Sequence, residues 1–472
     1  MKKYSSLKEI QTLISQKQLT LPDLLAYYFK QIEQNEHLNA FNEVFFLSAE
    51  VQAKAVQQKI EDGTAGKLAG MVIGIKDNIC YEGHIVTASS KMLEGFVSPY
   101  SSTVVQRLLQ EDAVIIGRLN CDEFAMGGSN ETSYYGVARN AVNPELVPGG
   151  SSGGSAVAVQ ADMCLSALGT DTGGSVRQPA AFCGQIGLKP TYGRISRYGV
   201  IAYASSFDQV GPITSSVEDA ALLLQVLAGA DDYDSTVSPV AVPDYPAHLN
   251  ERKKQKIAVL KETIESEALN PEIKSAILKS IEQLKADGHS VEYVSFDLLD
   301  YLVPAYYILT TAEASSNLSR YDGVHYGHRN MEAKSLNELY KLSRAEGFGE
   351  EVKRRILLGT FVLSAGYYDA YYQKAQQVRR LIREKIDVLF QDYDFILSPV
   401  APTAAFKIGD HVQDAIVMYM ADIFTVLPSL SGNPAIALPI GNNKAGLPLS
   451  IQFTAKHFEE DKLLAFSQAF LS

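Results

Sequence analysis

The string DTGGSVRQPAAFCGQIGLKPTYG at residues 171–193 decides the fold. It opens with an acidic residue and two glycines ahead of Ser175, so that successive backbone N–H groups can converge on one point. Such a turn suits an oxyanion hole beside a serine nucleophile. A D-T-G triplet also occurs in aspartic proteases, but their chemistry needs a second such carboxylate. The sequence holds no other D-T-G or D-S-G, which argues against that class.

A second string rich in glycine and serine, GGSSGGS, lies at residues 149–155. It can be a flexible hinge. It is not a P-loop, because no Lys-Ser/Thr pair follows the glycines. It contains the G-x-S-x-G pattern of the nucleophile elbow, which needs a strand directly before it. Residues 143–148 hold two prolines and no clear strand, which disfavours the elbow.

The third motif is Lys76, which follows a short apolar, β-branched run at residues 71–75. That run predicts a buried strand. A lysine at a strand end is usually solvated. If Lys76 instead enters a site of low dielectric, burial lowers its pKa and makes the neutral amine available as a base. Such a base is needed for a serine hydrolase here, because none of the eight histidines lies in a typical catalytic motif.

Composition excludes several classes of protein. The chain has 472 residues and a formal net charge of −12, which argues against a chain that binds nucleic acid or an anionic membrane by itself. Four cysteines without a C-x-x-C pair predict neither a disulfide framework nor a metal site. The N-terminus lacks the apolar stretch of a signal peptide, and residues 220–230, the most apolar window, are too few to span a bilayer. We therefore expect a cytoplasmic protein without membrane contact.

Helical patterns alternate with short apolar strands, which predicts an α/β architecture. Residues 1–65 read as helices and are expected to form a helical segment packed on the core. Residues 66–472 are expected to form one large domain, with a long surface loop near 231–250, where three prolines fall. Further expected elements are strands at 257–260, 291–296 and 395–397 and helices at 104–109, 271–286 and 367–389.

Taken together and in this order, the three motifs resemble the amidase signature family. The resemblance implies an α/β fold with a large mixed β-sheet flanked by helices on both faces, and a Ser–cis-Ser–Lys mechanism. It makes Ser175 the nucleophile and places Ser151, after a cis peptide bond, between Ser175 and Lys76. Neutral Lys76 would take the proton of the nucleophile through Ser151 and return it to the leaving ammonia. The backbone N–H groups implied for the oxyanion hole are those around Thr172, Gly173, Gly174 and Ser175.

Further stretches are similar to one branch of this family, the glutamine-hydrolysing subunits of tRNA-dependent amidotransferases. This similarity implies that the chain hydrolyses glutamine to glutamate and ammonia. The ammonia would pass to a partner subunit for ATP-dependent amidation of misacylated Glu-tRNA(Gln), and of Asp-tRNA(Asn) as a further option. It also implies a heterotrimer with two other subunits, in which the partner binds ATP and Mg and most of the tRNA, and this chain binds no cofactor. The stretches are residues 122–133, 312–323, 354–360 and 421–425.

The same similarity assigns glutamine binding to Tyr306, Arg355 and Asp422. A free amino acid offers an α-carboxylate to a guanidinium and an α-ammonium to a carboxylate, whereas lipid and aryl amides offer neither charge. Without this similarity, the favoured interpretation of Arg355 is a solvated residue on a helix face. Asp422 lies inside the apolar string MYMADIFTVL at residues 418–427, where an unpaired carboxylate would be costly, so a partner or ligand charge is expected.

Two alternatives stay open at the level of sequence. A stand-alone amidase acting on a small or lipid amide would share the catalytic residues without needing paired charges in its pocket. A non-enzymatic scaffold would use the Gly/Ser strings only as turns. Arg355→Ala separates the first alternative from a glutaminase, and covalent labelling of Ser175 by a sulfonyl fluoride would exclude the second.

Overall fold

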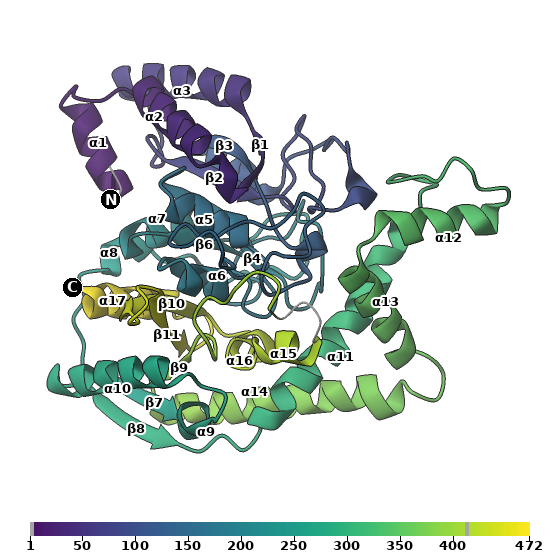
Figure 1. Ribbon diagram of the computed structural model, residues 1–472. Coiled ribbons are helices and arrows are strands. Elements are labelled where there is room, and N and C mark those ends of the chain that lie inside the picture. The colour runs from purple at the N-terminus through teal and green to yellow at the C-terminus, as the bar shows by residue number, and fades with distance from the viewer. Residues whose placement is uncertain (1–3, 411–414) are drawn as a thin grey trace.

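A mixed sheet of 11 strands runs through the protein in the order β1-β3-β2-β4-β6-β5-β10-β11-β9-β7-β8. The computed structural model (Figure 1) describes residues 4–410 and 415–472, without the side chains of residues 415–417. The strands are β1 (Phe41–Val44), β2 (Val72–Lys76), β3 (Val114–Leu119), β4 (Ser166–Asp171), β5 (Ile186–Lys189), β6 (Gln209–Thr214), β7 (Lys256–Leu260), β8 (Ser290–Val294), β9 (Phe395–Pro399), β10 (Ala435–Asn442) and β11 (Pro448–Ala455).

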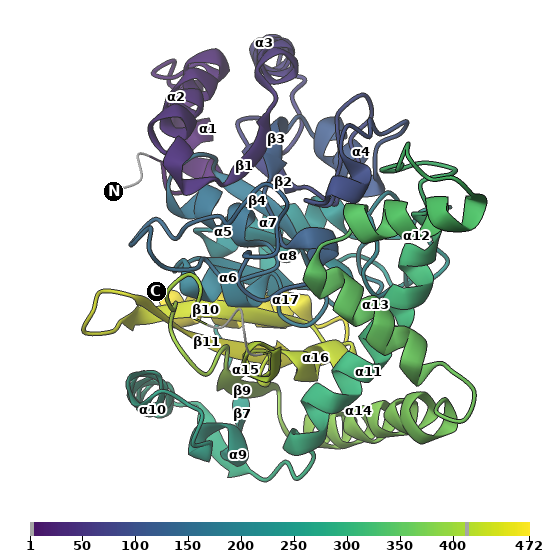
Figure 2. The ribbon, with the colours of Figure 1, turned by 45° about the vertical axis from the view of Figure 1, so that its right-hand side comes forward.

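Helices pack against both faces of this sheet, as the family resemblance implied (Figures 1 and 2). Helices α5 and α6 contact the central strands, and α7 and α17 pack on each other and on the sheet. Helices α11, α13 and α14 lie together at one side of the molecule, and α12 projects from that side. The helices are α1 (Leu7–Ser15), α2 (Leu21–Gln34), α3 (Phe46–Glu61), α4 (Thr103–Gln110), α5 (Gly153–Gln160), α6 (Arg177–Phe182), α7 (Val217–Leu227), α8 (Tyr245–His248), α9 (Lys261–Glu265), α10 (Pro271–Ala286), α11 (Leu299–Asn317), α12 (Leu336–Gly347), α13 (Glu350–Val362), α14 (Lys374–Asp392), α15 (Ala415–Met420), α16 (Val426–Ser431) and α17 (Glu460–Leu471).

The parallel strands β2, β3 and β4 position the chemistry. Every residue of the three strands is buried, as expected for parallel strands covered on both faces. In β2, Ile73 lies opposite Ser166 of β4 and Ile75 lies opposite Leu168, so both strands end at the same edge of the sheet. Ligands of α/β sheets bind outside the carboxyl ends of such strands. The end of β2 and the turn after β4 therefore meet at one place.

The expected strand at residues 71–75 and the expected helix at 271–286 are confirmed as β2 and α10. The first 65 residues differ from the prediction, since Phe41–Val44 forms the edge strand β1, antiparallel to β3. A four-residue strand is too short to interrupt a helical pattern visibly. The expected helix at 367–389 begins with a π-helical turn at Asp369–Gln373 and continues as α14.

Residues 231–250 form a loop, as expected, whose only regular element is the short α8. Arg194 anchors it, because the guanidinium donates to the carbonyl oxygens of Val240 and Ala241 at 2.9 and 3.0 Å and to the Tyr245 hydroxyl at 2.7 Å. One hydrophobic core extends from α1 to α17 and includes the buried faces of α2 and α3. The division of the chain at residue 65 stays a prediction.

The described parts of the chain lack two kinds of feature. No helix there is long and apolar enough to cross a membrane. No cluster of three or more His, Cys, Asp or Glu side chains there could hold a metal ion.

Candidate active site

Lys76 is the last residue of β2 and is completely buried. Its Nζ lies 2.7 Å from Ser151 Oγ, 3.0 Å from Ser152 Oγ and 3.0 Å from Thr170 Oγ1. Burial lowers the pKa of Lys76, although nearby thiol and carboxyl groups oppose the shift. In the neutral state the amine carries two N–H donors and a lone pair, so one of the three hydroxyls then donates to Nζ. The interpretation of Lys76 as a solvated strand end is therefore wrong.

Ser151 lies in the turn before α5, and the Gly150–Ser151 peptide bond is cis. The Ser151 carbonyl accepts the N–H of Asp122 at 3.1 Å, and the next residue, Ser152, donates its N–H to the carbonyl of Ser175 at 3.1 Å. The turn thus contacts Lys76 by side chains and the Ser175 segment by backbone. Ser175 is 8% exposed whereas Lys76 and Ser151 are 0% exposed, so Ser175 is the most accessible of the three residues.

The turn between β4 and α6 differs in one respect from the prediction for the oxyanion hole. The Gly174 N–H donates to Asp171 Oδ1 at 2.9 Å and is not available to a substrate. No hydrogen bond among the described residues uses the N–H of Thr172, Gly173 or Ser175. Gly174 has a φ of +135°, and a Cβ there would collide with the Thr425 side chain, so this position requires glycine.

A buried ion pair that sequence reasoning missed holds this turn. Arg177 donates from Nε to Asp171 Oδ2 at 3.0 Å and from Nη2 to Oδ1 at 2.8 Å, and both side chains are 0% exposed. Nη1 donates to the Thr425 carbonyl at 2.8 Å and to Gln452 Oε1 at 2.6 Å. Burial would raise the pKa of Asp171, but the Arg177 guanidinium lowers it overall. The sequence does hold a signal for this ion pair, since Asp171 and Arg177 are opposite charges at the two ends of the uncharged residues 172–176.

Tyr306 lies on α11 with its ring against the same turn. A Cβ added to Gly173 would overlap the Tyr306 hydroxyl, so the close approach depends on glycine at residue 173. The Tyr306 ring also meets Phe207 and Tyr307 edge-on, with centroids 5.7 and 5.0 Å away. The structure therefore brings Tyr306 beside the segment that carries Ser175.

Arg355, on α13, is only 3% exposed, which contradicts its interpretation as a solvated helix residue. Nε donates to Glu351 Oε1 at 2.8 Å, and Nη1 donates to the Tyr203 hydroxyl at 3.0 Å. Its Cζ lies 5.5, 5.3 and 5.5 Å from the ring centroids of Tyr203, Tyr307 and Tyr419. Among the described residues Nη2 donates no hydrogen bond, so this part of the guanidinium is free for an anionic ligand.

Asp422 is linked to Arg355 through an aromatic side chain. Its Oδ2 accepts the Tyr307 hydroxyl at 2.8 Å, and Tyr307 in turn lies against Arg355. Desolvation raises the pKa of Asp422 to about 7. No ion pair joins Asp422 to Arg355 within the described part of the chain. A cationic group bound at Asp422 would hold the carboxylate in its charged form.

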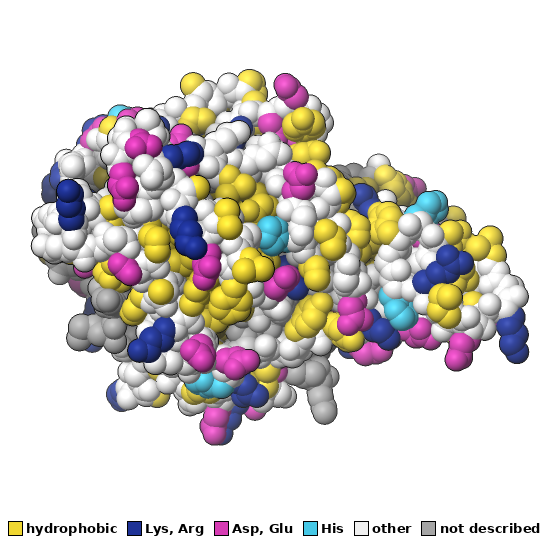
Figure 3. Space-filling model, turned by 90° about the horizontal axis from the view of Figure 1, so that it is seen from above, with side chains coloured by type: hydrophobic (Ala, Val, Ile, Leu, Met, Phe, Trp, Pro, Cys, Tyr) yellow, Lys and Arg dark blue, Asp and Glu magenta, His cyan; other side chains and the backbone are white. Residues whose placement is uncertain are grey.

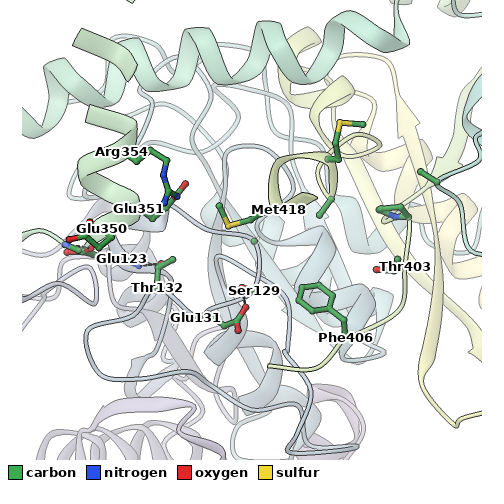
Figure 4. A pocket seen from close by; sticks show the side chains of 16 residues that line it. Glu123, Ser129, Glu131, Thr132, Glu350, Glu351, Arg354, Thr403, Phe406 and Met418 are labelled. Carbon is green, nitrogen blue, oxygen red and sulfur yellow. Dashed lines mark hydrogen bonds and ion pairs between the residues drawn. The ribbon is translucent and has the colours of Figure 1, made fainter. Parts of the chain in front are cut away.

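A cavity of about 530 Å³ borders these residues (Figure 4). Glu123, Glu350, Glu351 and Arg354 lie on one side of it in the view, and Thr403 and Phe406 lie on the other. Its lining includes Glu351, the partner of Arg355, and Ala421, the neighbour of Asp422. The cavity therefore lies next to Arg355 and Asp422, although neither side chain lines it.

The fold and this site define the class of protein. The family model described as Amidase matches residues 23–464, and the chain belongs to this family. A crystal structure of an amidase superimposes with a TM-score of 0.84 at 28% identity and covers 99% of both chains.

Individual relatives narrow the comparison. The chain is 49% identical over 459 residues to the A subunit of glutamyl-tRNA(Gln) amidotransferase from Koribacter versatilis, covering 97% of this chain and 95% of that one. It is 46% identical over 471 residues to the protein of the same name from Staphylococcus carnosus, covering 99% and 97%. The crystal structure of the protein of that name from Thermotoga maritima has a TM-score of 0.78 and 38% identity, covering 95% and 93%.

Proposed function

We propose that this chain is the glutaminase subunit of an amidotransferase that acts on Glu-tRNA(Gln). The observation that carries the proposal is the contact of 2.7 Å between buried Lys76 and Ser151, together with the guanidinium of Arg355 and the carboxyl group of Asp422, which both contact Tyr307. These two charges match the α-carboxylate and α-ammonium of a free amino acid. Relatives at 46–49% identity that are named as the A subunit of this amidotransferase support it.

The proposed reaction begins when Ser175 Oγ attacks the side-chain carbonyl carbon of glutamine. The hydroxyl proton of Ser175 passes to Ser151 Oγ, while Ser151 passes its own proton to neutral Lys76 Nζ. The N–H groups of Thr172, Gly173 and Ser175 are the donors left for the oxyanion. Collapse of the tetrahedral intermediate breaks the C–N bond, and the departing nitrogen takes the proton back to leave as ammonia. Water then hydrolyses the glutamyl ester by the same proton route, which yields glutamate.

The pocket orients the substrate. The α-carboxylate of glutamine would lie at Nη2 of Arg355, whose other nitrogens Glu351 and Tyr203 hold in place. The α-ammonium would pair with Asp422, and Tyr306 would close the side next to Gly173. Such fixed geometry brings the reactive carbonyl to Ser175 with little loss of entropy at the moment of reaction.

The remaining chemistry is assigned to partners. We propose a heterotrimer with two other subunits, in which a partner binds ATP and Mg and amidates the tRNA-linked carboxylate, while this chain binds no cofactor. The net charge of −12 disfavours a chain that binds tRNA alone, and on the face seen from above Lys and Arg are scattered among Asp and Glu (Figure 3). The proposed location is the cytoplasm.

Arg355→Ala tests the substrate. We expect KM for glutamine to rise about 100-fold, because a charge-assisted contact contributes about 3 kcal/mol. Hydrolysis of a small neutral amide should change little. Arg354→Ala is the matched control, because Arg354 is adjacent, about half exposed and bonded to the same Glu351 but lies outside the aromatic cluster around Arg355. Steady-state kinetics with glutamine and with the neutral amide measure both effects. Negligible turnover of glutamine by the wild type, with cleavage of neutral amides in the absence of partners, would favour a stand-alone amidase instead.

A further inference from the structure

Helix α13 carries Arg355, yet its own N-cap residue does not secure its first turn. The N-cap is Gly349, which has no side chain to accept a hydrogen bond. A helix start leaves its first N–H groups without partners inside the helix. The body of α13 packs on α11, but its start depends on acceptors from elsewhere in the chain or from water.

Glu123 supplies that contact from a segment far away in sequence. Its Oε2 accepts the Gly349 N–H at 2.8 Å, and its Oε1 accepts the hydroxyl of Ser90. A Cβ added to Gly349 would collide with Oε2, so glycine lets the carboxylate approach the backbone. Ser90 Oγ also lies 3.3 Å from the carbonyl oxygen of Gly347, the last residue of α12, although its single proton goes to the nearer Glu123. The Glu123–Ser90 pair thus lies against the end of α12 and is bonded to the start of α13.

The residue before Glu123 contacts the turn that carries Ser151. The preceding residue, Asp122, donates its N–H to the Ser151 carbonyl at 3.1 Å. Its carboxylate accepts the N–H of Asn130 at 2.9 Å and the hydroxyl of Thr132 at 2.8 Å, which folds residues 122–132 into a tight turn. Two adjacent residues therefore contact the Ser151 turn and the helix of Arg355.

The backbone after Glu123 keeps this turn in an unusual conformation. Phe124 and Ala125 have φ angles of +49° and +60°, which residues other than glycine rarely adopt. The Phe124 ring packs on Tyr321 and Phe348, with centroids 5.1 and 5.6 Å away. Phe348 immediately precedes Gly349. Outliers of this kind persist where the surrounding structure fixes them and gather at functional sites.

Glu123 is 3% exposed and lines the cavity beside the pocket. Burial raises the pKa of Glu123 to about 7, because its hydrogen bonds to Ser90 and Gly349 offset only part of the desolvation. An apolar side chain would fill the space without that cost. Such a side chain would, however, accept neither the Gly349 N–H nor the Ser90 hydroxyl.

We propose that Glu123 is a positioning residue that couples the Ser151 turn to α13, so that Arg355 holds the α-carboxylate of glutamine at the right distance from Ser175. The inference rests on the proposed function, since it assumes glutamine as the substrate. Glu123 itself does not touch the substrate. It acts through Gly349 and the first turn of α13.

Glutamine kinetics of the full chain in its assembled complex test this role. Glu123→Ala should raise KM for glutamine about tenfold and leave kcat within threefold, because a shifted α13 misplaces the substrate contact rather than the nucleophile. Glu123→Gln should stay near the wild type, since its amide oxygen still accepts the Gly349 N–H and its NH₂ group donates to Ser90. Ser90→Ala should raise KM as Glu123→Ala does. If Glu123→Ala does not fold, Ser90→Ala provides the test.

The matched control is Glu131→Ala, which removes another carboxylate of the same cavity, bonded to Ser129 and to the Gly409 N–H rather than to α13. Its KM should stay unchanged. The rate at which a sulfonyl fluoride labels Ser175 should be the same in all variants. Loss of kcat with KM unchanged, slower labelling in Glu123→Ala, or equal defects in Glu123→Gln and Glu123→Ala would overturn the proposal. Absence of glutamine turnover in the wild-type complex would instead refute the proposed function.

Discussion

Replacing Lys76 by methionine is expected to lower kcat for glutamine hydrolysis by about 10³- to 10⁶-fold, the range seen when one member of a catalytic triad is removed. Methionine keeps the length and apolar stem of the side chain but cannot take a proton. Ser151 Oγ then loses its contact of 2.7 Å with the amine, so the hydroxyl of Ser175 has no route for its proton. Steady-state hydrolysis of glutamine by the purified complex measures the loss.

Lys189→Met is the matched control, because Lys189 is also buried but donates to the Pro190 carbonyl and not to a catalytic residue. Its kcat per folded molecule should stay within about tenfold of the wild type. In the wild type the rate should rise with pH while Lys76 loses its proton and then level off. Since burial lowers the pKa of Lys76, this rise should lie below the ordinary pKa of a lysine. A Lys76→Met variant with near-normal kcat would contradict the assigned base.

Replacing Arg177 by leucine is expected to destabilise the protein by about 3–5 kcal/mol, the cost of breaking a buried ion pair on one side. The variant leaves the carboxylate of Asp171 buried without its cation. It also removes donors from the Thr425 carbonyl and from Gln452. Chemical denaturation should show a lower midpoint, and soluble yield should fall.

The double variant Asp171→Asn with Arg177→Leu separates charge from packing. If the buried charge causes most of the loss, removing it should restore part of the stability, because a neutral amide costs less to bury than an unpaired carboxylate. A change of less than about 1 kcal/mol in Arg177→Leu alone would show that the ion pair is not what holds the turn after β4. Activity should not return in the double variant, since the asparagine oxygen can still accept the Gly174 N–H but its NH₂ group cannot accept the Val176 N–H that Asp171 Oδ2 binds.

Much of the fold followed from local pattern. The apolar run before Lys76 and the capped helix at 271–286 were predicted because their periodicity and flanking residues agree. Strand β1 was missed, since its four residues acquire their conformation from pairing with β3 and not from their own sequence. The π-helical turn at Asp369–Gln373 likewise has no distinct signal at the level of sequence.

The residues of the site that lie in local motifs could be predicted, whereas their tertiary surroundings could not. Lys76, Ser151 and Ser175 stand in glycine-rich motifs, and the structure brings the first two into contact and the backbone of the third beside them. The surroundings of Arg355 could not be predicted, because Tyr203 comes from a segment without a motif and reaches α13 only through the tertiary fold. The use of the Gly174 N–H by Asp171 also depends on atomic placement that no spacing reveals.

The central claim, that Ser175 releases ammonia from glutamine for use by a partner subunit, is tested most directly by Ser175→Ala in the assembled complex. Amidation of Glu-tRNA(Gln) is measured with glutamine and, separately, with an ammonium salt as the nitrogen source. We predict that glutamine no longer supports amidation, whereas ammonium supports it as in the wild-type complex. Loss of amidation with both nitrogen sources, or retained amidation with glutamine, would contradict the account.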